Sequence, residues 1–222
     1  MRSILYIQCK ECKKDNFILY SIGDTSVKGT CSCGEKFSYS LSSSITIGDR
    51  ILEKSRYEYV KNEDYSTSIV FSATAFECEL SSLYFKWKNV KNNISDQELE
   101  KLLRNLGTIS KKIQVVSKLM FPEGFNEFVK QEKELCQSAK NDFPSLDADN
   151  LVESFQKKLF RPRNRILHFG YSKYNKKIAN SCFHIANFGM RILRRMDEYK
   201  IISTNNRQQA IPQAVKAALF RR

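Results

Sequence analysis

Turn-forming residues are scarce in this chain, which has eight glycines and four prolines among 222 residues. An all-β fold needs such residues after every short strand, so the scarcity argues against one and favours long helices. Long apolar runs are lacking too, because the most apolar segment, residues 68–85, carries Glu77 and Glu79 in its middle. That segment is therefore expected to form a buried helix rather than a membrane span. The start has neither a long apolar stretch nor a small-residue cleavage site, so we expect a cytoplasmic protein.

Acidic residues are missing from one long segment. Residues 154–196 contain no Asp or Glu but eleven Lys and Arg, in a chain whose formal net charge is +13. So basic a balance indicates a polyanionic partner, with nucleic acid the first candidate and an anionic membrane the second. The alternative is a basic face that serves only solubility.

Four of the seven cysteines fall within the first 33 residues, as Cys9 and Cys12 in "CKEC" and Cys31 and Cys33 in "CSCG". Cytoplasmic thiols stay reduced, so this spacing predicts a metal site rather than disulfides. Two close thiol pairs can complete a tetrahedral shell of four sulfurs around Zn²⁺. The second pair has one intervening residue instead of two, and Gly34 supplies a flexible position behind it.

The segments around these cysteines are short, β-branched or aromatic, and separated by turn-like residues. About 40 residues cannot bury enough apolar surface to fold alone, so a metal is the expected support. The pattern resembles a zinc ribbon, in which zinc is structural because all four ligands come from the protein. The alternative is a small β-domain with four free cysteines.

The sequence predicts a mainly α protein, with a small β zinc ribbon followed by an up-and-down helical bundle. We place the ribbon at residues 1–45, a charged connector at 46–64, the bundle at 65–202 and a basic tail at 203–222. Apolar spacing and capping signals predict the helices of the bundle. They are expected near residues 66–90, 95–106, 111–120, from Pro122 onward, 151–160 and 176–199.

Glu77 lies among the apolar positions of the first long helix of the bundle. A carboxylate in such surroundings needs a partner, which a nearby basic site would supply. The alternative is that Glu77 points to solvent.

The segment "RPRNRILHFG", residues 161–170, has the side chains that RNA cleavage needs. If Pro162 begins a helix, Arg163 and Asn164 lie in its first turn, where free N–H groups favour an anion. Asn164 and His168 are four residues apart and share a face. Histidine suits acid or base chemistry near neutral pH, and arginine matches phosphate oxygens. The alternative is that His168 is an ordinary helical histidine bonded to a backbone carbonyl. The other histidine, His184, lies in the apolar last helix and is expected to pack there.

RNA supplies its own nucleophile, because the 2′-hydroxyl attacks the adjacent phosphate once a base removes its proton. An acid then protonates the leaving 5′-oxygen, and a cation stabilises the charged intermediate. No metal is required for this reaction.

Residues 66–199 resemble the HEPN superfamily, whose motif is an Arg, a polar residue, three further residues and a His near a helix start. Arg163, Asn164 and His168 match it, whereas Phe169 stands where Gly often follows directly. The resemblance implies a four- to five-helix bundle, often a homodimer whose two motifs build one cleft, and in many members metal-independent endoribonuclease activity. Flanking Arg161 and Arg165, together with Lys173, are then candidate RNA contacts.

We therefore expect an endoribonuclease of HEPN type, in which Arg163 binds the phosphate, Asn164 orients it and His168 transfers protons. The expected cofactor is structural Zn²⁺, and the expected partners are RNA and a second copy of the chain, with no membrane. The resemblance implies a toxin or antiviral defence role, with a protein partner or antitoxin at the ribbon. One alternative is a non-catalytic HEPN-like adaptor that binds RNA or protein. Another is a zinc-bound structural dimer.

Overall fold

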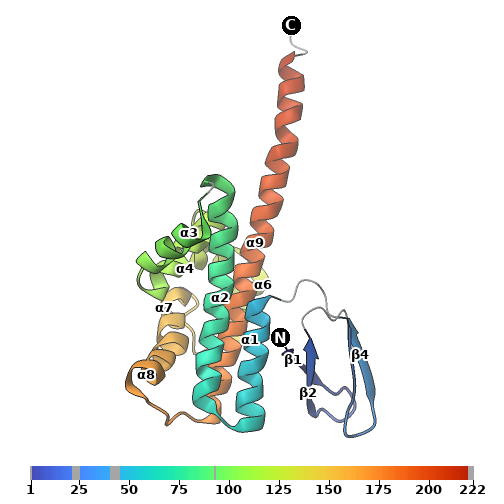
Figure 1. Ribbon diagram of the computed structural model, residues 1–222. Coiled ribbons are helices and arrows are strands. Elements are labelled where there is room, and N and C mark those ends of the chain that lie inside the picture. Colours follow the sequence, from blue (N-terminus) through green and yellow to red (C-terminus); the bar gives the residue numbers. More distant parts are fainter. Residues whose placement is uncertain (1, 22–25, 41–45, 93, 220–222) are drawn as a thin grey trace. The chain divides into compact units, whose positions relative to one another are not determined.

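The computed structural model describes residues 2–21, 26–40, 46–92 and 94–219 (Figure 1). The fold is mainly helical, with two antiparallel strand pairs at the amino-terminal end. This confirms the predicted fold class at the level of a mainly α protein with a small β part. The chain divides into two compact units, one of residues 1–79 with 154–189 and one of residues 80–153 with 190–222.

The β part of the first unit consists of two hairpins. Strand β1 (Arg2–Gln8) pairs with β2 (Asp15–Ser21), and β3 (Ser26–Thr30) pairs with β4 (Lys36–Ser40). The last pairs in register are Gln8 with Asp15 and Thr30 with Lys36, so Cys9 and Cys31 come directly after the first strand of their hairpins. The predicted end of the ribbon, residue 45, lies outside the described residues.

The residues predicted as a connector, 46–64, are helical. Helix α1 (Ile47–Tyr57) begins with a capping box between Thr46 and Asp49, and a π-helical turn, η1 (Glu58–Asn62), follows it. Buried Ser55 donates to the main-chain oxygen of Ser68 on the next helix at 2.8 Å. This segment therefore packs as part of the helical structure of its unit.

Two long helices, α2 (Tyr65–Asn92) and α9 (Lys176–Leu219), contribute to both units. In the first unit they approach closely at Gly189, where an added Cβ would lie 2.5–2.8 Å from ring atoms of Phe76. The Phe76 ring packs edge-on against Phe155 and Phe160, with centroids 5.6 and 5.9 Å away. All three rings are almost completely buried, so they form the centre of the core of this unit.

Residues 151–169 form one continuous helix with a widened turn. Helix α7 (Leu151–Phe155) leads into the π turn η2 (Gln156–Phe160) and then into α8 (Arg161–Phe169), and both Phe160 and Arg161 have right-handed helical backbones. Within the π turn the Arg161 N–H donates to the Gln156 oxygen, five residues earlier. The widened turn accommodates Pro162, which has no N–H to donate. Of the two roles open to Pro162, a kink within a helix or the first position of one, the second does not apply because helical backbone precedes it from Leu151.

Besides parts of α2 and α9, the second unit contains two separate short helices and two linked ones. Helix α3 (Asp96–Asn105) has the predicted capping box of Ser95 and Glu98, and α4 spans Ile109–Met120. The helix predicted after Pro122 is two helices, α5 (Phe125–Gln131) and α6 (Lys133–Asn141), because Glu132 between them is extended. Helix α9 also continues through the predicted tail, as far as Leu219. Among the described residues, no helix is long and apolar enough to cross a membrane.

Candidate functional site

The sulfur atoms of the four amino-terminal cysteines lie together. All four are within 4.8 Å of one another, with Cys9 and Cys33 at 3.6 Å and Cys12 and Cys31 at 3.5 Å. A regular tetrahedron with Zn–S bonds of about 2.3 Å has edges of about 3.8 Å, which falls within this range. The arrangement fits a metal ion with four thiolate ligands, as the spacing predicts; the identity of zinc remains part of our proposal.

The two cysteine turns explain the unequal spacing of the pairs. The Cys9 N–H donates to the Lys14 oxygen at 2.9 Å, and the Cys31 N–H donates to the Glu35 oxygen at 2.8 Å. The second turn is one residue shorter than the first, which matches the one-residue difference between "CKEC" and "CSCG". Gly34, with φ of 92°, allows the tighter turn because a side chain there would be strained.

The surroundings of Cys31 and Cys33 shift the pKa values of their thiols in opposite directions. A hydrogen bond from the Cys33 main chain lowers the pKa of the Cys31 thiol to about 6, against the opposing effect of desolvation. The Glu35 main chain acts in the same direction on Cys33, but the neighbouring Cys12 and Cys31 sulfurs raise the pKa of Cys33 to about 12. The Asn16 amide also donates to the Cys31 sulfur at 3.6 Å, a contact that no sequence signal indicated. A bound divalent cation would release the remaining thiol protons.

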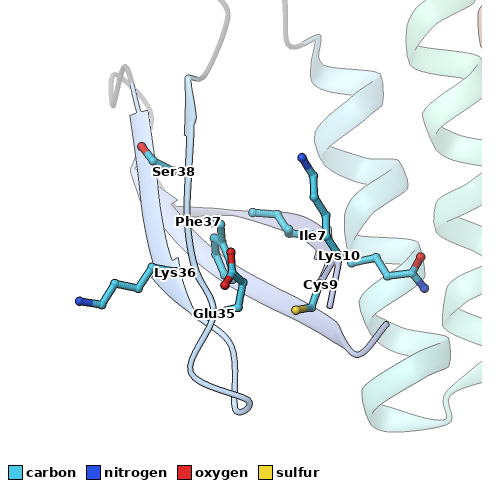
Figure 2. Close-up of a pocket in the computed structure, with 8 residues that line it drawn as sticks. Ile7, Cys9, Lys10, Glu35, Lys36, Phe37 and Ser38 are labelled. Carbon is cyan, nitrogen blue, oxygen red and sulfur yellow. The ribbon is translucent and has the colours of Figure 1, made fainter. Parts of the chain in front are cut away.

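A hollow of about 300 Å³ lies beside Cys9 and is lined by both hairpins. Figure 2 shows Glu35 and Phe37 of the second hairpin facing Ile7 and Cys9 of the first. Four protein thiolates leave no open coordination position for water, so this region has the character of a structural metal site with an adjoining surface.

The α8 residues that were predicted to act in RNA cleavage divide into a paired set and an exposed one. Arg163 donates to the Glu77 carboxylate of α2 and to the side-chain oxygen of Asn164, each at 2.9 Å. Of the two alternatives for Glu77, a basic partner or a carboxylate that points to solvent, the structure shows the basic partner. The Asn164 oxygen is occupied by Arg163, so its amide NH₂ is the group left to bind a ligand.

His168 lies one turn beyond Asn164 and is exposed. Within the part of the chain that the structure describes, no hydrogen bond joins it to Arg163 or Asn164. Its ring centroid is 6.5 Å from that of Phe169, and Gly170, with φ of 61°, ends the helix directly afterwards. The structure thus brings Arg163 and Asn164 into contact and presents His168 separately on the surface. His184, which was expected to pack, is also exposed on α9.

A surface hollow of about 350 Å³ runs along the motif helix. Arg161 and Arg165, both predicted as RNA contacts, line it, whereas the predicted contact Lys173 lies exposed on the segment that follows α8. The sequence interpretation missed three lining residues, Gln156, Lys157 and Phe169. Lys157 and Phe169 lie four residues from Arg161 and Arg165, and this spacing is the signal that could have identified them. The full lining is Gln156, Lys157, Arg161, Asn164, Arg165 and Phe169.

The anion site that a helix start at Pro162 would have provided is absent from this region, which the structure describes throughout. Because the helix runs unbroken from Leu151, the N–H groups of Arg163 and Asn164 lie in its interior rather than in a first turn. Positive charge at the hollow therefore comes from side chains.

Comparison of the chain with protein-family models, with curated proteins and with solved structures finds no match.

Proposed function

We propose that the chain is a metal-independent endoribonuclease of HEPN type, with its active site on α8. One observation carries the proposal: Asn164 lines a hollow together with three exposed basic side chains, and His168 follows one turn later on the same helix. Such a surface offers cations for phosphate and a group able to transfer protons. Residues 154–196 contain no acidic residue, and the carboxylate that the fold brings to this segment, Glu77, is paired with Arg163.

In the proposed reaction, the 2′-hydroxyl of RNA attacks the adjacent phosphorus after losing its proton to a base. The bond to the 5′-oxygen breaks, and that oxygen takes a proton from an acid. The products are a 2′,3′-cyclic phosphate and a 5′-hydroxyl. His168 fills one of the two proton-transfer roles, and a second copy of the chain, which the HEPN resemblance implies, would supply the other histidine.

The contacts of Arg163 change the role first expected for it. Both of its terminal nitrogens already have partners, so we assign phosphate binding to exposed Arg161 and Arg165. Arg163 is then a positioning residue that orients the Asn164 amide. The metal ligands belong to the ribbon and have no role in this reaction. A toxin or antiviral defence role rests on the family resemblance alone.

A non-catalytic RNA-binding adaptor is the second candidate. The observation that favours it is the separation of His168 from the Arg163–Asn164 pair, together with the pairing of Arg163 to Glu77. This surface retains its cations whether or not it cleaves RNA.

Cleavage of single-stranded RNA separates the two candidates. The enzyme predicts cyclic-phosphate ends from the wild-type chain and from His184→Ala, and no cleavage by His168→Ala. The His184 variant is a matched control because it removes the only other histidine, also on an exposed helical position. Brief treatment with a chelator should leave cleavage intact. RNA that is bound in a salt-dependent manner but remains uncut would support the adaptor instead.

A further inference from the structure

Four side chains at four-residue intervals form a row along the hollow on α8. Lys157, Arg161 and Arg165 provide three cations, and Phe169 ends the row. The last three lie on regular α-helix, where four residues correspond to about 6 Å along the axis. The row therefore presents positive charges at regular intervals that lead to one aromatic ring.

Phe169 is unusually open for a phenylalanine. Its side chain is 81% exposed, the largest value among the exposed large apolar residues of the described chain. A single exposed apolar residue is common on protein surfaces. A phenyl ring that lines one hollow with three cations is a more specific arrangement, because it offers a π-face beside groups that bind phosphate.

Aromatic contacts surround Arg165, the residue of the row that precedes Phe169. The Arg165 guanidinium lies 6.0 Å from the centre of the Tyr171 ring, and Tyr171 packs edge-on against Tyr174 at 4.9 Å. The Tyr174 hydroxyl donates to the Pro162 oxygen at 3.3 Å. These contacts join the segment after Gly170 to α8 next to Arg165, whereas the Phe169 ring projects openly beside them.

We propose that Phe169 is a stacking platform for one unpaired nucleobase of single-stranded RNA, whose adjoining phosphates bind Arg165 and Arg161. Aromatic side chains in basic grooves bind single strands in this manner, because every base has a π-face. The His168 ring is 6.5 Å from that of Phe169, so the ribose of the stacked nucleotide lies near the proton-transfer group. Bases inside a duplex are stacked on one another and offer no face to the ring. The inference deepens the proposed function and rests on it for the role of His168, whereas the stacking itself is a matter of binding.

The test measures binding of a short 2′-O-methyl single strand, which lacks the attacking hydroxyl and stays uncut. Phe169→Ala should weaken binding about tenfold, while Phe169→Trp should bind as the wild type does. Leu167→Ala is the matched control, since Leu167 is 52% exposed on the same helix but does not line the hollow. Duplex RNA should bind the wild type and Phe169→Ala equally.

Fluorescence supplies a readout of the contact itself. Trp87, in the second unit, is the only tryptophan in the chain, so Phe169→Trp adds one reporter at the hollow. Single strands should quench its emission beyond the change seen in the wild type. Equal binding by Phe169→Ala and the wild type, or no added quenching, overturns the stacking site. Absence of binding to any RNA also overturns it, and capture of apolar peptides at Phe169 instead would assign the patch to a protein partner.

Cleavage decides the proposed function separately. If the wild type cleaves RNA but Phe169→Ala binds equally well, the function stands and the stacking site fails. If stacking is observed but no RNA is cut, the stacking site stands and the endoribonuclease fails.

Discussion

Arg163 and Glu77, 86 residues apart in the sequence, form an ion pair of 2.9 Å that joins α8 to α2. Their side chains are 24% and 27% exposed, so the pair is mostly withdrawn from water. Its free energy should lie between that of surface pairs, at most about 1 kcal/mol, and that of buried ones. Because Arg163 is engaged in this pair, it is not among the cations available to a ligand at the hollow.

Loss of this pair should destabilise the fold. We expect Glu77→Gln to lower the free energy of unfolding by about 1–2 kcal/mol, because a half-buried guanidinium loses its partner. Urea denaturation measures the change. Glu100→Gln is the control, since its pair with Arg104 is exposed and should contribute less than about 0.5 kcal/mol. Equal losses in the two variants would contradict the structural role of the Arg163–Glu77 pair.

Gly189→Ala should also destabilise the first unit. Alanine normally stabilises a helix by about 1 kcal/mol relative to glycine. Here the added methyl meets buried Phe76 and Phe155, and such overpacking costs about 1–3 kcal/mol. The net loss should therefore be about 1 kcal/mol, measured by thermal unfolding. Ser181→Ala, at an exposed position on the same helix, should leave stability nearly unchanged; a gain for Gly189→Ala would exclude the close approach.

Metal binding should be stoichiometric and depend on pH. We expect one zinc ion per chain, measured by elemental analysis, and its loss in Cys33→Ser but not in Cys136→Ser. The raised pKa of Cys33, about 12, keeps its thiol protonated at neutral pH, so zinc must displace a proton. Affinity should consequently fall as the pH falls, with proton release on binding. Zinc retained by Cys33→Ser would remove that residue from the ligand set.

Cys182 should resist alkylation in the native protein. Burial raises the pKa of its thiol to about 12, and the thiol donates to the Lys158 oxygen at 3.4 Å. At pH 8 roughly one molecule in ten thousand would carry the thiolate. Mass spectrometry after iodoacetamide treatment should find Cys182 unmodified until urea unfolds the chain. Modification at the same rate with and without urea would show that the site opens readily.

Salt dependence should identify the cations that bind phosphate. Each neutralised phosphate of a single strand contributes about 0.7 to the slope of log affinity against log salt concentration. Arg161→Gln and Arg165→Gln should each reduce the slope by about this amount, whereas Lys111→Gln, exposed on α4, should not. Unchanged slopes for both arginine variants would place the RNA elsewhere.

The sequence predicted those parts of the fold that residues close together in the chain determine. Spacing identified the four cysteines, and the Ser95–Glu98 capping box located the start of α3. The apolar spacing also predicted long helices near residues 66–90 and 176–199, which are α2 and the first half of α9. In each case neighbouring residues determine the structure.

Features that depend on tertiary contacts were not predictable in the same manner. Residues 46–64 looked like a connector because they are charged, yet Ser55 is buried by bonds to α2 that the sequence does not indicate. The pairing of Arg163 with Glu77 could be predicted only from the position of Glu77 in space. A proline in a helical segment can mark either a helix start or a distorted turn within a helix. Only the backbone conformation shows that Pro162 follows a π turn.

The π turn in residues 156–160 determines the direction in which the side chains of α8 point. One extra residue in a turn rotates each later side chain by roughly 100° relative to a regular helix. Phe155 before the turn meets the core at Phe76, and Arg163 after it meets Glu77 on the same helix α2. Insertion or deletion of a single residue here would alter the length of the helix very little. It would rotate the side chains that now face α2 away from that helix and change which ones line the hollow.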